Sequence, residues 1–194
     1  MLNSLSAVAS RCLLLVLAYV LTGCASLTAV SIPDADLEFE LQGRAALHYG
    51  AEGGSTRITW RHASAADDLL ITTSLGQGVA RITRRGGEVR LATADGKEYS
   101  AADAETLTEA VLGWRLPLAG LPDWVRGRPA AGRPAKTRKD ENGRIASIEQ
   151  DTWQIGYTGW VGELPSRLTL NHDDVDGKAA VEIRLIIDQW KAGT

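Results

Sequence analysis

The chain has 194 residues, a formal net charge of −3 at pH 7 and only two cysteines. Its length suffices for one domain with its own hydrophobic interior, and so mild a charge implies no nucleic-acid partner. Both cysteines lie within the first 24 residues, so we expect a folded domain that has no disulfide and depends on its core alone.

Residues 1–23 have the features of a bacterial signal peptide. Arg11 supplies a positive charge, an apolar run follows from Cys12 to Val20, and small residues end the segment. This run is shorter than the roughly 20 residues that a spanning helix needs. We therefore predict export across the inner membrane and cleavage after Gly23; an uncleaved membrane anchor is the alternative.

The sequence Leu21-Thr22-Gly23-Cys24 resembles the lipobox of bacterial lipoproteins. The resemblance implies that Cys24 is coupled to diacylglycerol and becomes the new N-terminus. Several acyl chains on one residue give stable anchoring. Ala25 stands where a lipoprotein retained in the inner membrane would typically carry Asp. The expected location is therefore the periplasmic face of the outer membrane, with the lipid anchor on Cys24.

Residues 24–36 are predicted to be the lipidated N-terminus and a tether, because the stretch is small and polar and contains Pro33. Residues 37–194 form the predicted folded domain. There, short runs alternate apolar and polar residues; Thr56, Ile58 and Trp60 share one face, for example, and this period of two predicts strands. Strands are predicted at residues 38–49, 55–61, 68–73, 78–84, 88–93, 144–150, 152–160, 166–171 and 180–190.

Dipeptides with glycine separate many of these strands, and their glycines accept the positive φ that hairpin turns require. They are Gly53-Gly54, Gly86-Gly87, Asp95-Gly96, Asn142-Gly143 and Asp176-Gly177. The predicted sheet is an antiparallel meander. No period of 20 to 50 residues repeats, which argues against a propeller or solenoid.

Two helical segments interrupt the strands. Residues 103–113 begin with an N-cap candidate, carry Ala104, Leu107 and Val111 on one stripe, and end in glycine. Residues 118–126 place apolar side chains at near-helical spacing, and Pro122 limits them to a short helix.

A sheet with one apolar face cannot stay flat in water, so it must curl, and the helices must cover its open side. The predicted fold is mainly β: a curved antiparallel sheet that forms an open half-barrel with an α-helical lid. Periodicity leaves open whether the interior is packed or hollow.

Residues 113–129, with tryptophans at 114 and 124 and prolines at 117 and 122, resemble the helical signature of the LolB family. Members of that family are outer-membrane receptors that accept lipoproteins from the periplasmic carrier LolA. Segments 39–44, 55–60, 152–157 and 183–190, with Leu164-Pro165, resemble the family's strands in the expected order. The resemblance spans nearly the whole mature chain.

The resemblance implies an apolar cavity for acyl chains, and it implies neither catalysis nor a cofactor. The implied partners are a LolA-type carrier, lipoprotein cargo and outer-membrane lipids, and we expect a monomer. Inward-facing strand positions and the helical stripe supply the candidate lining residues of the cavity: Trp60, Leu69, Ile71, Leu91, Leu107, Val111, Leu116, Leu121, Trp124, Trp153, Ile155, Leu168, Leu170, Ile183 and Leu185. Ordinary core packing is the alternative for each of them.

Leu75 stands alone among small polar residues and glycines in the segment 72–78. The family carries an exposed apolar residue on a loop near the cavity mouth, associated with delivery into the membrane, and Leu75 matches that position. A lone exposed leucine is otherwise ordinary. Ser74 stands where the family often has proline, which leaves the stiffness of the loop open.

Three other features of the sequence give weaker indications of function. The segment 172–177 resembles a calcium loop, but His172 holds the first ligand position and Glu182 falls one residue short, so a polar turn is the better interpretation. His48, His62 and His172 do not have the spacing of metal ligands and the sequence contains no known catalytic motif, so an enzyme is not predicted. The basic stretch, defined as Arg126, Arg128, Arg133, Lys136, Arg138 and Lys139, is either a solvated loop or a docking rim for the carrier or anionic headgroups.

The sequence therefore predicts a lipoprotein receptor and insertase. The alternatives are a structural envelope lipoprotein with a solid core that binds a protein partner and, more remotely, a cryptic hydrolase.

Overall fold

The computed structural model describes residues 27, 29–173 and 180–193. Eleven strands form one antiparallel sheet that curves around two helices, α2 (Ala104–Leu112) and α3 (Leu121–Trp124). A short 3-10 helix, η1 (Asp34–Asp36), precedes the sheet. The strands are β1 (Phe39–Tyr49), β2 (Glu52–Ala63), β3 (Ala66–Thr72), β4 (Gly78–Arg85), β5 (Glu88–Thr93), β6 (Glu98–Ala101), β7 (Lys136–Lys139), β8 (Ile145–Gln150), β9 (Trp153–Val161), β10 (Leu164–His172) and β11 (Val181–Ala192).

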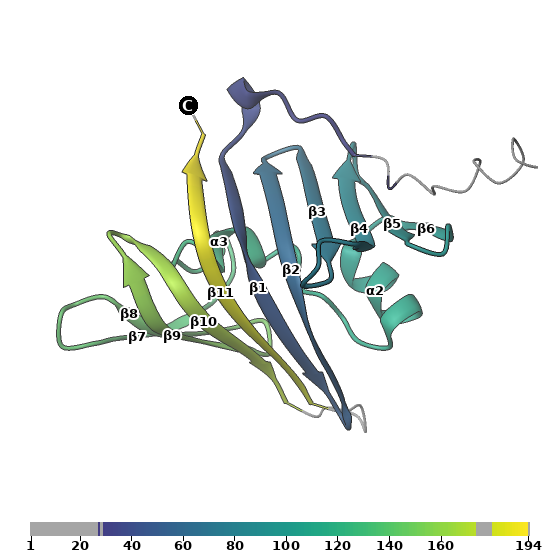
Figure 1. Ribbon diagram of the computed structural model, residues 1–194. Helices are drawn as coiled ribbons and strands as arrows, with labels where there is room; N and C mark the ends of the chain where they lie inside the picture. The colour runs from purple at the N-terminus through teal and green to yellow at the C-terminus, as the bar shows by residue number, and fades with distance from the viewer. Residues whose placement is uncertain (1–26, 28, 174–179, 194) are drawn as a thin grey trace, which may run out of the picture.

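Two meanders make up the sheet, in the order β6-β5-β4-β3-β2-β1-β11-β10-β9-β8-β7 (Figure 1). The first and last strands join them, since β1 pairs with β11 from Phe39↔Ala192 to Tyr49↔Val181. The sheet is therefore not the single meander predicted. The edge strands of the sheet are β6 and β7. Residues 102–135, which contain both helices, connect these two strands in the chain, and we call this segment the insertion. Because it runs from one edge of the sheet to the other, the insertion crosses the opening of the curved sheet.

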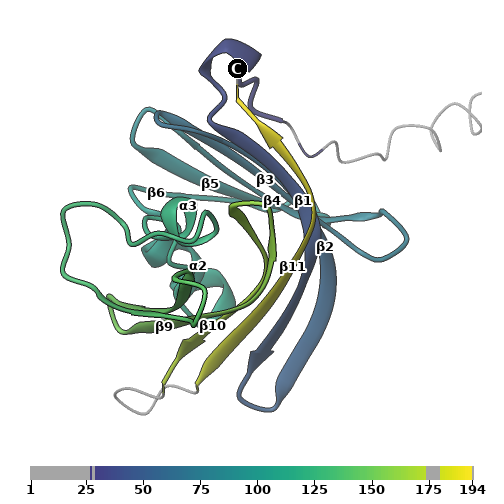
Figure 2. The same ribbon diagram turned by 90° about the vertical axis from the view of Figure 1, so that its left-hand side faces the viewer.

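The concave face of the sheet holds the helices (Figure 2). One apolar cluster fills the space between them, and it includes Leu41, Ile82, Leu91, Trp124 and Leu170, all nearly inaccessible to solvent. The predicted mainly β, open antiparallel sheet is confirmed.

Helix α2 begins and ends as its sequence predicts, whereas α3 covers only four residues of the predicted segment 118–126. Asp103 caps α2, since its side chain accepts a hydrogen bond from Thr106 N at 2.7 Å. Gly113 ends α2 with a left-handed φ of 80°. Pro122 lies in the first turn of the shorter α3, where the missing N–H costs nothing.

The predicted strands are present with shifted ends, but one predicted turn is wrong. Gly53 and Gly54 lie inside β2, and the chain reverses at residues 50–51 instead. Gly50 has the positive φ of 58° that this turn requires. The prediction missed β6 and β7, which are short and largely exposed and thus lack an apolar alternation. The predicted turn at Asp176-Gly177 lies outside the described residues.

Candidate functional site

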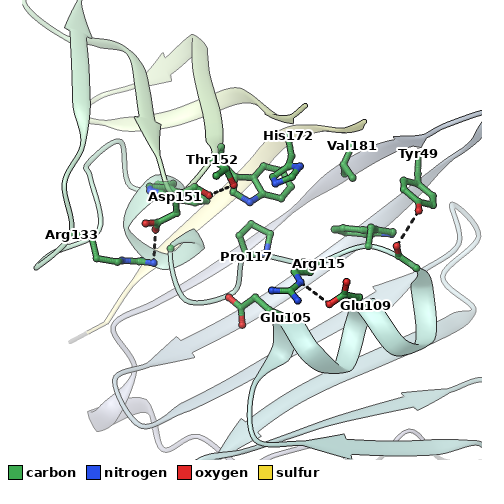
Figure 3. A pocket seen from close by; sticks show the side chains of 15 residues that line it. Tyr49, Glu105, Glu109, Arg115, Pro117, Arg133, Asp151, Thr152, His172 and Val181 are labelled. Carbon is green, nitrogen blue, oxygen red and sulfur yellow. Dashed lines mark hydrogen bonds and ion pairs between the residues drawn. The ribbon is translucent and has the colours of Figure 1, made fainter. Parts of the chain in front are cut away.

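A pocket of about 530 Å³ opens between the insertion and one end of the sheet (Figure 3). Strands β1, β9, β10 and β11 contribute Tyr49, Trp153, His172 and Val181, which lie at their ends. The rest of the wall comes from the insertion and the β8–β9 turn: Glu105, Glu109, Gly113, Trp114, Arg115, Pro117, Gly120, Trp124, Arg133, Asp151 and Thr152. This volume falls within the range of roughly 300–1,000 Å³ that is typical of small-molecule sites.

Tryptophans form much of the apolar wall. Trp153 is 5% exposed and lies against the ring of His172, with 5.1 Å between ring centroids. Trp114 and Trp124 approach from the insertion. Rigid indole rings can keep a space open where flexible aliphatic chains would fill it. The wall therefore offers a hydrocarbon chain broad apolar contact.

Two ion pairs lie at the rim of the pocket (Figure 3). Arg115 pairs with Glu109 at 2.6 Å within the insertion, and Arg133 pairs with Asp151 at 2.5 Å across to the β8–β9 turn. Both pairs are partly exposed to water, so each contributes little to stability, about 0–1 kcal/mol. The Arg133–Asp151 pair thus closes the rim with an interaction that is easily broken.

The β8–β9 turn has unusual backbone angles. Asp151 and Thr152 have φ of 53° and 69°, a region that L side chains rarely adopt, and Thr152 is β-branched. Each such residue costs on the order of 1–3 kcal/mol and often lies at a ligand site. This turn borders the pocket, so its strain coincides with the candidate site.

A buried amide fixes the insertion to the sheet deeper inside. Gln150, 3% exposed, accepts hydrogen bonds from Trp124 Nε1 and Ala130 N, both at 2.8 Å. Its Nε2 donates to the carbonyls of Ala130 and Arg133. Tyr157 donates its hydroxyl to the carbonyl of Trp124 at 2.7 Å, and burial raises the pKa of this phenol. These buried bonds make α3 the firm end of the insertion.

The predicted lining residues all belong to the main apolar cluster or pack against it, but only Trp124 and Trp153 border the pocket. Of the others, Ile71, Val111 and Ile183 are partly buried and pack against the main cluster, and the remaining ones are buried within it. The described interior is therefore a packed core with a pocket at one end. Sequence reasoning missed the charged rim, because ion pairs between distant segments leave no periodic signal.

Leu75 is 88% exposed at the tip of the β3–β4 loop and does not border this pocket. Backbone hydrogen bonds hold the loop: Thr73 N donates to Gln77 O, and Gly76 N donates to Thr73 O. Gly76 supplies a left-handed φ of 85°, and Arg57 donates to the carbonyl of Ser74 at 3.3 Å. These bonds define the shape of the loop with Ser74 in place of proline, and the leucine side chain is exposed at its tip.

Acidic side chains partner much of the basic stretch. Arg126 pairs with Glu38 at 3.1 Å, Arg128 with Asp123 at 2.7 Å, and Lys136 lies 3.8 Å from Glu149. Arg138 and Lys139 lie on the exposed edge strand β7. The charge available for docking is therefore smaller than the sequence suggests, and it is concentrated at that edge.

A second buried polar group lies at the other end of the sheet. Asp67, 1% exposed, accepts hydrogen bonds from Trp60 Nε1 at 2.9 Å and from Arg84 Nε at 2.5 Å, and it contacts His62 Nδ1 at 2.6 Å. Burial alone would raise the pKa of Asp67, but the hydrogen bond and charge of His62, together with Arg84, outweigh it and lower that pKa. Asp67 therefore carries a stabilised negative charge inside the fold.

Within the described part of the chain, no group of three or more His, Cys, Asp or Glu side chains is arranged to hold a metal. Over the same residues, no helix is both long enough and apolar enough to cross a membrane.

Together, the curved open sheet, the helical insertion on its concave face and the indole-walled pocket define an open antiparallel β-sheet protein with a candidate binding pocket at one end. The family model for the outer membrane lipoprotein LolB matches residues 37–190, and the chain belongs to the LolB family. Its function therefore lies in lipoprotein localisation at the outer membrane.

Relatives named outer-membrane lipoprotein LolB extend over most of the chain. The one from Thiobacillus denitrificans is 37% identical over 91% of this chain and 94% of its own length. The one from Nitrosomonas europaea is 38% identical over 80% of this chain and 74% of its own length, and the one from Dechloromonas aromatica is 34% identical over 92% and 95%. The crystal structure of a LolA superfamily protein from Nitrosomonas europaea aligns with 87% of this chain and 90% of that chain at a TM-score of 0.47 and 8% identity, too low a similarity to support an inference.

Proposed function

We propose that this protein receives lipoproteins from a LolA-type periplasmic carrier, shelters their acyl chains under the helical insertion, and inserts them into the outer membrane. One observation carries the proposal beyond family membership: an indole-walled pocket of about 530 Å³ opens between the insertion and the concave face of the sheet. The mechanism needs no catalytic group. The scaffold alternative has no comparable support.

Energetics explain the need for a sheltered path. At about 0.8 kcal/mol per methylene, exposing one long acyl chain to water costs on the order of 10 kcal/mol. The chains must therefore pass from one apolar cavity to the next. Each step runs forward only if the receiving site binds the chains more tightly than the donating site, and the bilayer must bind them most tightly.

The pocket is the proposed entrance, and the predicted lining residues behind it are the proposed path. The Arg133–Asp151 pair and the 3.0 Å bond from the Tyr49 hydroxyl to Gly113 O hold the insertion near the rim. These contacts are weak compared with the buried bonds of Gln150. The insertion would thus act as a lid that opens at the rim and stays fixed at α3.

Blocking the pocket tests the proposal. A soluble form that begins at Ala25 contains no cysteine, so His172→Cys provides a single thiol on the pocket wall. Unlabelled His172→Cys protein should accept cargo from a loaded carrier, and a bulky maleimide on that thiol should abolish acceptance. The same label on Val161→Cys, an exposed position away from the pocket, is the control. Equal acceptance by both labelled proteins would exclude the pocket as the entrance.

Leu75 is the proposed delivery residue. Leu75→Glu should leave acceptance from the carrier intact and strongly reduce insertion into liposomes, because a charged tip cannot enter the hydrocarbon region. Val161→Glu, a charge at another exposed apolar position, is the matched control. Equal delivery by the Leu75 variant and the parent would remove Leu75 from the mechanism.

The anchor completes the proposal. Residues 1–23 are the proposed signal peptide and Cys24 the acylated N-terminus, both outside the described residues, and the protein acts as a monomer at the periplasmic face of the outer membrane. The mass of the mature N-terminal peptide measures the acylation directly. An unmodified Cys24 would contradict it.

A further inference from the structure

The segment that precedes the sheet is attached to the fold by hydrogen bonds. We call Leu27 and residues 29–37 the N-terminal strap. Val30 N donates to Asp68 Oδ2 at 3.0 Å, Arg81 donates to Leu27 O at 2.9 Å, and Arg85 donates to Ser31 O at 3.1 Å. All three acceptor or donor side chains come from the β3–β4 hairpin, so the strap is joined to this hairpin along its length.

Burial fixes the strap as well. Ile32 is 3% exposed and forms a separate apolar cluster with Leu37, Ala63 and Ala66. Asp68, which holds the strap, is 4% exposed and pairs with Arg81 at 2.7 Å. Because Ile32 is buried and the strap backbone bonds to the shielded Asp68–Arg81 pair, this segment is docked, which its small, polar composition did not predict.

The start of the strap lies in space next to the loop that carries Leu75. A Cβ atom on Gly78 would lie 2.8 Å from Leu27 Cδ1, so Leu27 covers the first residue of β4, three positions after Leu75. Cys24 precedes Leu27 by three residues, and an extended chain spans at most about 3.6 Å per residue. Chain length therefore limits the anchor point to within about 11 Å of Leu27, the residue that contacts the start of β4.

We propose that the docked strap orients the protein on its own bilayer, so that the acyl chains of Cys24 and the side chain of Leu75 enter the same leaflet side by side. The inference rests on the proposed acylation of Cys24. Val79, 39% exposed, adds an apolar contact next to the loop, and exposed Arg57 lies behind Ser74, where headgroup phosphates would meet it. A short, docked connection keeps the local concentration of the loop at the membrane high.

This orientation has a consequence for traffic. The β3–β4 loop projects from the convex side of the sheet, opposite the helices (Figure 2). With that side against the bilayer, the insertion and its pocket face the periplasm, from which a carrier arrives. The strap thus separates a membrane face from a loading face.

The test uses the full-length acylated protein in phosphatidylethanolamine–phosphatidylglycerol vesicles, with neither carrier nor cargo. Since Cys12 leaves with the signal peptide and Cys24 is blocked, Ser74→Cys gives one free thiol for an environment-sensitive dye. The dye at residue 74 should be shielded from aqueous iodide, and the same dye on Glu141→Cys, in the β7–β8 turn, should not. Equal quenching at the two sites would overturn the proposal.

Releasing the strap should expose the loop. The double variant Val30→Pro/Ile32→Ser removes the bond to Asp68 and the buried side chain, and should raise iodide quenching at residue 74 several-fold. The conservative single variant Ile32→Val keeps both contacts, and residue 74 should stay as shielded as in the parent. A flexible linker inserted between Ser26 and Leu27 keeps the strap docked but lengthens the reach, and should also increase quenching. Shielding that persists in both variants would overturn the inference. An unacylated N-terminal peptide would instead refute the anchor in the proposed function, and the inference with it.

Discussion

The indole N–H of Trp124 donates to the side-chain oxygen of Gln150 over 2.8 Å, and both side chains are buried. The bond joins α3 to the end of β8, residues that are separated by 26 positions in the chain. Together with the burial of Leu121 and Trp124, this bond holds the short helix on the concave face of the sheet.

Replacing Gln150 with leucine should destabilise the protein strongly. The change leaves Trp124 Nε1 and the backbone of Ala130 without partners, and each buried polar group left unsatisfied costs about 1–3 kcal/mol. Urea unfolding measures the loss. Gln154→Leu, an exposed position four residues along the chain, is the control and should change stability little. Equal stability of the two variants would show that Gln150 does not fix the insertion.

Replacing Gly43 with alanine should weaken the junction between the first and last strands. The pairing of β1 with β11 shifts register at Gln42/Gly43, and a Cβ on Gly43 would lie 2.3 Å from Ile186 O. Relief of that clash requires the backbones to separate, at a cost of roughly 1–3 kcal/mol. Gly156→Ala, in β9, meets no atom within 4 Å and is the matched control. Thermal unfolding at the same temperature for both variants would contradict this account of the junction.

Local patterns predicted every strand except β6 and β7, and both helical segments, because neighbouring residues carry the period-two and period-3.6 patterns of burial. They placed a turn at Gly53-Gly54 because the dipeptide has hairpin chemistry, although the longer pairing of β1 and β2 moves the reversal to residues 50–51. The β1–β11 junction pairs residues far apart in the chain: Arg44 and Asp188, whose side chains meet at 2.8 Å, are separated by 144 positions. No local pattern contains such a pairing.

The candidate site was predictable only in part. Alternation in the strands and the helical stripe predicted residues that are buried in the main apolar cluster or pack against it, such as Trp153, and the family resemblance pointed to Leu75. Neither signal predicted the Arg133–Asp151 pair at the pocket rim or the docking of the strap, because these contacts join segments that are distant in the sequence.

The charge of Asp67 should make stability depend on pH in the acid range. Its pKa is lowered in the folded state, so its contribution is fully present above the unfolded pKa of about 3.9 and is lost as pH falls through the lower folded value. Asp67→Asn should therefore be clearly destabilising at pH 7, and the difference from the parent should shrink below about pH 4. Urea unfolding across this range measures it. Asp36→Asn, at an exposed position, is the control; a difference for Asp67→Asn that stays constant with pH would refute the role of its charge.

Breaking the rim pair should loosen the insertion without unfolding the sheet. Arg133→Ala removes the contact to Asp151 and a bond to the carbonyl of Ala119, so backbone amides of residues 113–120 should exchange hydrogen faster. Arg128→Ala breaks a pair with Asp123 that lies wholly within the insertion, and should leave exchange in that segment unchanged. If the two variants exchange alike, the rim pair does not hold the lid.

The central claim is that the space between the insertion and the sheet shelters acyl chains. A diacylated lipopeptide with a photoreactive group at the end of one chain, bound to the soluble form that begins at Ala25, tests it when the cross-linked residues are mapped by mass spectrometry. The account predicts cross-links to interior positions such as Trp153, Ile155 and Leu170. Cross-links confined to exposed positions, with none inside the curve of the sheet, would contradict it.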